Sequence, residues 1–126
     1  MSVVKVPSGS KLGLGFSRAV RAGNLVFVSG CAPIAPEGGV AAPGDMKAQT
    51  LRCFEIIEAA LEGAGAEMRH VVRTRVFLKD MSRWKEAGEA HGEVFRDIEP
   101  ACSFIGSPGF IDPGWLVEIE ADAVIS

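Results

Sequence analysis

The stretch WLVEIEADAVI, residues 115–125, decides the fold, because apolar and acidic side chains alternate along it without a break. Alternation with a period of two is typical of a β-strand with one buried and one open face. The apolar side consists of Val117, Ile119, Ala121 and Ala123. The opposite side carries Glu118, Glu120 and Asp122. We therefore expect a strand over 115–125 that covers a core and presents three carboxylates on its other face.

The valine-rich stretch HVVRTRVFLK, residues 70–79, predicts a second long strand. Arg73 and Arg75 are two residues apart, so both should project from one face. If the two strands are neighbours, these arginines can pair with the carboxylates across the ladder, each pair contributing about 0.2–1 kcal/mol. Two other interpretations stay open, a solvated acidic face and a carboxylate in a subunit cleft that positions a water or carries a proton.

The rest of the chain predicts four more strands and two helices. Further strands are expected at 3–6, 17–21, 24–29 and 101–105, with a hairpin turn at Ala22-Gly23-Asn24. Asp45 should cap a helix that ends near Glu62, and Asp80 or Ser82 should cap a second helix that ends before Pro100. The order β-β-β-α-β-α-β-β indicates an α+β domain with both helices on one face of a mixed sheet.

Length and composition set further limits. The chain has 126 residues, enough for one domain over 1–126, and a sheet face left open in so small a domain would need another subunit to cover it. The net charge of −3 argues against binding to nucleic acid. The sequence has neither an apolar run long enough to span a membrane nor a signal-peptide pattern, so we expect a cytoplasmic protein. The three cysteines match no zinc motif, and we expect reduced thiols and no metal.

Five segments in the same order resemble the RidA/YjgF family. They are AVRAGNLVFVSG at 19–30, QT at 49–50, VVRTRVFLKDM at 71–81, PA at 100–101 and VEIEA at 117–121. The resemblance runs over roughly residues 15–125. It implies a chorismate-mutase-like fold and a homotrimer, with the sheets forming a central barrel and a cleft between each pair of subunits. It also implies hydrolysis of reactive enamines and imines, such as 2-aminoacrylate, to 2-keto acids and ammonia without a cofactor or metal.

The resemblance assigns site residues position by position. In deaminating members an arginine follows the Pro-Ala pair and binds the substrate carboxylate through a bidentate contact, whereas this chain has Cys102 there. Phe16 stands where the family has a loop tyrosine, and Gly30 matches the glycine whose amide faces the ligand. Glu118 matches the carboxylate that positions the hydrolytic water.

The strand after Pro100 should line the same cleft. Ser103 and Phe104 lie on it, and the amide of Phe104 is the expected hydrogen-bond donor to the ligand. His91 stands at a cleft-lining position that is usually aromatic in the family. It is either a packed, hydrogen-bonded core residue or a ligand contact. Arg75 is either a salt-bridge partner or a substitute cation, because members with the arginine commonly have a small residue there.

The three cysteines could be packing residues or reactive thiols. Cys31 and Cys102 could face one cleft from adjacent subunits. They are either small buried residues or reactive thiols that act as a nucleophile or a redox sensor. Cys53 is expected to pack or to lie on the surface.

The preferred hypothesis is a small trimeric protein that hydrolyses enamine or imine intermediates, with a substrate range altered because Cys102 replaces the carboxylate-binding arginine. Its ligand would be a small imine, enamine or carbonyl compound. A non-catalytic trimer that binds a small ligand or protects proteins is the alternative. Other chemistry on a small imine-like pathway intermediate is a third option.

Overall fold

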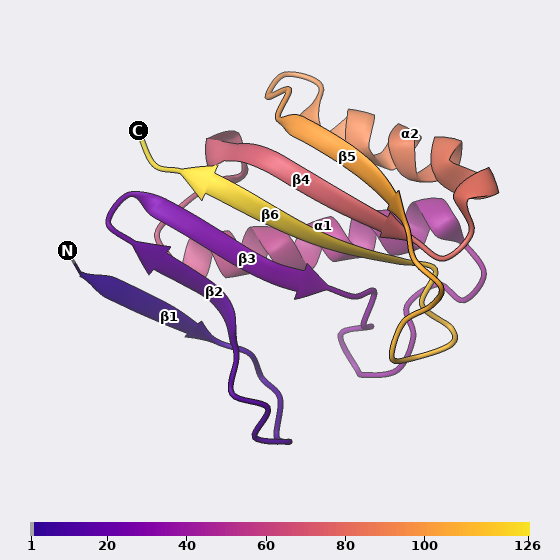
Figure 1. Ribbon diagram of the computed structural model, residues 1–126, viewed down its shortest axis with the longest axis horizontal. Helices are drawn as coiled ribbons and strands as arrows, with labels where there is room; N and C mark the ends of the chain where they lie inside the picture. Colours follow the sequence, from indigo (N-terminus) through magenta and orange to yellow (C-terminus); the bar gives the residue numbers. More distant parts are fainter. Residues whose placement is uncertain (1) are drawn as a thin grey trace.

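The computed structural model describes residues 2–126 as one six-stranded mixed sheet with two α-helices on one of its faces (Figure 1). The strands are β1 (Val3–Pro7), β2 (Ser17–Ala22), β3 (Leu25–Cys31), β4 (Val71–Leu78), β5 (Ala101–Gly106) and β6 (Val117–Val124). The helices are α1 (Met46–Gly63) and α2 (Trp84–Phe95), and short 3-10 turns cover Met68–His70 and Met81–Arg83. The α+β class and the element order predicted from the sequence are confirmed.

The C-terminal strand β6 lies inside the sheet, whose order is β1-β2-β3-β6-β4-β5. It pairs antiparallel with both β3 and β4, while β4 and β5 are parallel. The alternating residues predicted to face inward are buried, with Val117, Ile119 and Ala121 at 0% exposure. They pack against α1 in a core that includes Phe54 and Ile57, and burying a large apolar side chain stabilises a fold by about 1.5–3 kcal/mol.

Helix boundaries follow the predicted caps with one difference. The side chain of Asp45 accepts a hydrogen bond from the amide of Ala48 at 3.0 Å, which caps α1 as expected. Asp80 accepts a hydrogen bond from the amide of Ser82 at 3.0 Å, but it caps the 3-10 turn at Met81–Arg83. The second helix therefore starts later than expected, at Trp84.

Two sequence-based expectations at strand ends are wrong. Residues 115 and 116 lie outside β6, because the amide of Trp115 closes a turn on the carbonyl of Asp112 at 3.1 Å. His70, the first residue of the strand expected over 70–79, lies instead in a 3-10 turn and is 6% exposed. Its Nδ1 accepts a hydrogen bond from the amide of Glu67 at 3.0 Å, and this local bond holds the ring inside the fold.

The sheet face opposite the helices stays open in the single chain. Adjacent residues in the register of five strands form one row across this face, Lys5, Val20, Phe27, Asp122 and Arg73. Phe27 is 47% exposed. The open face thus combines exposed aromatic surface with the acidic row of β6.

Gln49 ties α1 to the loop that precedes β6. Its side chain is fully buried, with Nε2 donating to the carbonyl of Gly114 at 3.0 Å and Oε1 accepting from the amide of Leu116 at 2.9 Å. The amide side chain therefore satisfies a partly buried backbone donor and acceptor that lie outside the strand ladders. This bond pair fixes the C-terminal end of loop 107–116.

We predict that Gln49→Leu lowers the free energy of unfolding by about 1–3 kcal/mol, because two partly buried backbone groups lose their hydrogen-bond partners. Urea denaturation measures the change. Glu62→Leu, at an exposed position of the same helix, should stay within about 0.5 kcal/mol of the wild type. Equal stability of the two variants would contradict the role assigned to Gln49.

Candidate functional site

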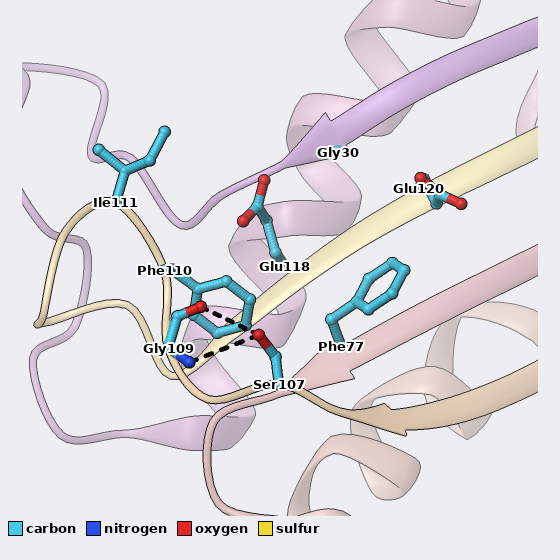
Figure 2. Close-up of a pocket in the computed structure, with 8 residues that line it drawn as sticks. All are labelled: Gly30, Phe77, Ser107, Gly109, Phe110, Ile111, Glu118 and Glu120. Carbon is cyan, nitrogen blue, oxygen red and sulfur yellow. Dashed lines mark hydrogen bonds between the residues drawn. The ribbon is translucent and has the colours of Figure 1, made fainter.

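Glu118 projects from β6 onto the open face, where its carboxylate covers the backbone of β3 at Gly30 (Figure 2). A Cβ atom added at Gly30 would lie 2.8 Å from Oε1 of Glu118, closer than real Cβ atoms approach other atoms. The backbone of Gly30 does not have a positive φ, so the missing side chain matters here for space and not for conformation, since a Cβ atom would displace the carboxylate end of Glu118. The carboxylate of Glu118 therefore packs directly against the backbone of Gly30.

Glu118 lies at the edge of an open hollow of about 700 Å³. Its lining residues come from β3, β4, β6 and loop 107–116, and they are Gly30, Phe77, Ser107, Gly109, Phe110, Ile111, Glu118 and Glu120. Figure 2 shows the carboxylate between the β3 backbone and the loop. Ser107 braces the loop, since its hydroxyl donates to the carbonyl of Gly109 at 2.9 Å. The hollow thus places two acids, Glu118 and Glu120, beside aromatic and aliphatic side chains.

Burial raises the pKa of Glu118 above the ordinary glutamate value. The positive charge of Arg18 opposes this shift, and the negative charge of Glu120 adds to it. Desolvation acts in this direction because it penalises the charged form. A carboxyl group whose pKa moves toward neutrality is better suited to exchange protons with a reacting group.

Arg18, on β2, is a site residue that the sequence analysis did not find. Its Nη1 donates to the carbonyl of Gly30 at 2.9 Å, to Oγ of Ser29 at 3.2 Å and to Sγ of Cys31 at 3.5 Å. These contacts span the irregularity in the pairing of β3 with β6. The guanidinium also lies 5.7 Å from the ring centroid of Phe16. Arg18 follows the predicted site residue Phe16 by two residues, and this spacing was the feature of the sequence that could have identified Arg18.

Arg75 makes the cross-strand contacts predicted for it. Its Nη1 lies 3.1 Å from Oε1 of Glu120 and 3.3 Å from Oδ2 of Asp122. These side chains are about one third exposed, so each pair contributes at most about 1 kcal/mol. Within residues 2–126, Glu118 is the one carboxylate of the acidic row that forms no ion pair. Binding of a ligand by Arg75 stays a prediction.

A second group of the predicted site residues gathers around β5 and α2. The ring of Phe104 packs edge-on against Trp84 and His91, with centroids 6.1 and 6.3 Å apart. Phe104 therefore points to the helix side of the sheet, and by alternation Cys102 does too, whereas Ser103 points to the open face. In one chain, Cys102 and Glu118 thus lie on opposite faces of the sheet.

His91 is packed and hydrogen-bonded, as one of the two interpretations expected. Its Nε2 lies 2.8 Å from Oγ1 of Thr74, and its ring is 4.7 Å from that of Phe95 and 5.7 Å from that of Phe54. Burial lowers the pKa of His91, which favours the neutral ring near pH 7. A ligand contact by His91 stays a prediction.

The three cysteines have different surroundings. Cys31 has no exposed surface, and burial raises the pKa of its thiol, an effect that the charge of Arg18 partly opposes. Cys53 is buried in the core, and its pKa is raised well above the ordinary value by burial. A raised pKa keeps a thiol protonated and unreactive, so Cys31 belongs with the small core residues. Cys102 is free and exposed on the edge strand.

Residues 2–126 contain no cluster of three or more His, Cys, Asp or Glu side chains arranged to hold a metal ion. In the same part of the chain, neither helix combines the length and the apolar character that crossing a membrane requires.

We predict that the carboxyl group of Glu118 titrates above the ordinary glutamate pKa, which carbon-detected NMR measures directly. Arg18→Met should raise that pKa further, because the opposing positive charge is removed. Arg21→Met removes the same charge from the same strand at a residue that does not act on Glu118, and it should leave the pKa unchanged. A fall in the pKa of Glu118 in Arg18→Met would contradict the assigned electrostatics.

Comparison with known proteins shows the family to which the chain belongs. The family model described as endoribonuclease L-PSP matches residues 11–125. A RutC family protein of Pyrococcus abyssi is 43% identical over 86 residues, which cover 68% of this chain and 68% of that protein. The 3-aminoacrylate deaminase RutC of Acinetobacter baylyi is 31% identical over 105 residues, covering 83% of this chain and 82% of the relative.

Solved structures give the same result. The crystal structure of a member of the YjgF/YER057c/UK114 family from Mycobacterium tuberculosis superposes with a TM-score of 0.88 at 44% sequence identity. The superposition covers 98% of this chain and 100% of that one. The likeness therefore includes every strand and loop that holds Glu118.

Proposed function

Because the chain belongs to the RidA/YjgF family, we propose that it hydrolyses reactive enamines and imines to carbonyl compounds and ammonia. The observation that carries the proposal is the half-buried carboxylate of Glu118, held against Gly30 at the edge of a hollow. Support for the reaction class comes from the 3-aminoacrylate deaminase among the relatives.

Glu118 would act on the water that attacks the substrate. In the proposed reaction its carboxylate accepts a proton from this water while the oxygen adds to the carbon of the C=N bond. The resulting carbinolamine takes up a proton on nitrogen and releases ammonia, which leaves a carbonyl group. An enamine enters the same path after protonation at carbon gives the iminium ion, the protonated form of the imine. The amide of Gly30 is proposed as a donor to the ligand.

The complete cleft in this proposal needs a neighbouring subunit. One chain contributes Phe16, Gly30 and Glu118, and its neighbour would contribute Cys102, Ser103, Phe104 and His91. Support comes from β5, an exposed edge strand that presents Cys102, and from the open sheet face. Because Cys102 provides no fixed positive charge, the substrate range should differ from that of members with arginine there. A cytoplasmic location fits the three free thiols.

We predict that the protein accelerates hydrolysis of 2-iminopropionate, generated from alanine by an amino-acid oxidase and trapped with semicarbazide. Glu118→Gln should lower the rate by roughly 10²–10⁴-fold, because the amide cannot accept the proton. The wild-type rate should fall with decreasing pH at a pH above the ordinary glutamate pKa, as the raised pKa of Glu118 requires.

Glu93→Gln is the matched control, since Glu93 lies on α2 in an exposed ion pair with Lys47, at 2.7 Å. This variant should retain the wild-type rate. A wild-type rate equal to the spontaneous rate would reject hydrolysis of this imine and favour the non-catalytic binding protein. Full activity in Glu118→Gln would reject the role of Glu118.

We predict a trimer in solution, with a mass three times the chain mass of 13.3 kDa by light scattering. Phe27→Glu should dissociate it, because a new charge beside Asp122 would have to be buried in the covered face. Ile34→Glu places the same charge on an exposed apolar residue outside the sheet, and it should leave the mass unchanged. A monomeric wild-type protein would remove the intersubunit cleft.

A further inference from the structure

A groove of about 400 Å³ lies beside helix α1, on the face of the sheet that the two helices cover (Figure 1). Helix α1 supplies four of its lining residues, and Met68 and Val94 supply the rest. The α1 residues are Leu51, Phe54, Glu55 and Glu58. Steps of three and four residues place them on one face of the helix. They extend over about 10 Å of its length. We call this surface the helix groove.

The larger part of the lining of the helix groove is apolar. The ring of Phe54 packs edge-on against Phe95, with centroids 5.2 Å apart, and is almost fully buried. Leu51, Met68 and Val94 are half-buried, so part of their apolar surface meets water. Covering such a surface is favourable, because apolar area is removed from water.

The charged part of the lining is acidic. It consists of two carboxylates, and the six lining residues include no cation. Glu55 pairs with Arg52 at 3.3 Å. Within residues 2–126, Glu58 forms no ion pair, and neither does Glu62, one turn further along α1. Two negative charges therefore lie next to the apolar lining without a counter-charge from the described chain.

The positions of these carboxylates act against the stability of α1. Glu55, Glu58 and Glu62 follow one another at spacings of three and four residues, where like charges repel. Glu62 also lies in the last turn of α1, which contains no basic residue, and a negative charge there opposes the helix dipole. Arg21 donates to the carbonyl of Ala64 at 3.1 Å, but it forms no ion pair with Glu62. A local rule that is broken without an internal gain is expected at a surface with a function.

We propose that the helix groove docks a basic amphipathic helix of a partner protein. The apolar face of that helix would cover Leu51, Met68 and Val94, and its lysines or arginines would lie against Glu58 and Glu62. An amphipathic helix suits the groove because its apolar side chains recur at the same three- and four-residue spacing that α1 presents. Its positive charges would also remove the repulsion within α1. The proposal is independent of the proposed hydrolysis, since Glu118 lies on the other face of the sheet.

Other occupants complement the groove less well. A second copy of this chain would bring the same carboxylates against one another. A nucleic acid or an anionic membrane would carry charge of the same sign as Glu58 and Glu62. A small amine would compensate one carboxylate at a time and leave most of the apolar lining in water. A basic helix satisfies both the charge and the apolar surface.

An NMR titration of the full-length protein, labelled at its methionine methyl groups, tests the proposal. The probe is a synthetic peptide of about 16 residues, long enough to form a helix, with leucines on one face and lysines beside them. The control peptide has glutamates in place of the lysines. The Met68 methyl signal should shift with the lysine peptide and stay unchanged with the glutamate peptide. Met81, which is exposed in a turn outside the groove, should shift with neither.

Three outcomes of this titration would overturn the proposal. The first is a Met68 signal that the lysine peptide leaves in place. The second is an equal shift with both peptides, which would remove the role of charge. The third is a Met68 shift that depends on protein concentration without any peptide, which would assign the groove to a second copy of the chain.

A charge reversal at the groove gives the quantitative test. Glu58→Lys should raise the Kd of the lysine peptide roughly 3- to 30-fold, because a repulsion replaces an exposed ion pair. Glu58→Gln should cause a smaller loss. Glu37→Lys makes the same change in net charge at an exposed loop residue outside the lining, and it should bind as the wild type does.

An equal Kd for Glu58→Lys and the wild type would reject the docking of a basic helix on this face of α1. So would complete displacement of the peptide by propylamine at the same concentration of positive charge, because a site for small cations would then explain the binding. The peptide should instead remain bound in propylamine and dissociate as the salt concentration rises.

Discussion

The close approach of the Glu118 carboxylate to the backbone at Gly30 is the constraint on which the site depends. A side chain at position 30 would occupy the space that the carboxylate now fills, so the end of the Glu118 side chain would have to move away from this backbone. The same approach takes the carboxylate partly out of water, and this raises its pKa. Arg18 then fixes the carbonyl of Gly30 from the other side. Close packing, desolvation of Glu118 and the charge of Arg18 thus all depend on the position of Gly30 in β3.

The three carboxylates of β6 lie in two different electrostatic environments. Glu120 lies opposite Arg75 and Asp122 lies opposite Arg73, and both carboxylates form partly exposed ion pairs with Arg75, which add little to stability but offset part of the negative charge of this face. Glu118 lies one alternation further along, opposite Phe77 instead of an arginine. It faces the hollow without an ion-pair partner, although Arg18 acts on it through space. The period-two pattern alone predicts the same environment for the three carboxylates. Their ion pairing differs because different residues of β4 lie opposite them.

Much of the fold could be predicted because single strands carry their own pattern. The unbroken alternation of residues 117–124 predicts a strand with two unlike faces, and the spacing of Arg73 and Arg75 predicts a partner for it. The placement of His70 and the role of Arg18 could not be predicted, since each depends on a contact that periodicity does not encode. A local bond to Glu67 buries the His70 ring, and Arg18 reaches an irregular turn of β3.

Within a single chain, the predicted site residues form two separate groups. Phe16, Gly30 and Glu118 come together around Arg18, whereas Cys102, Phe104 and His91 gather on the helix side at the edge strand. Resemblance assigns all of them to one site, and only a neighbouring subunit can join the two groups. The cation that the family places at position 102 would approach the substrate from the neighbour's half of such a cleft. Glu118 lies in the other half, so a ligand bound in such a cleft would contact groups from two subunits.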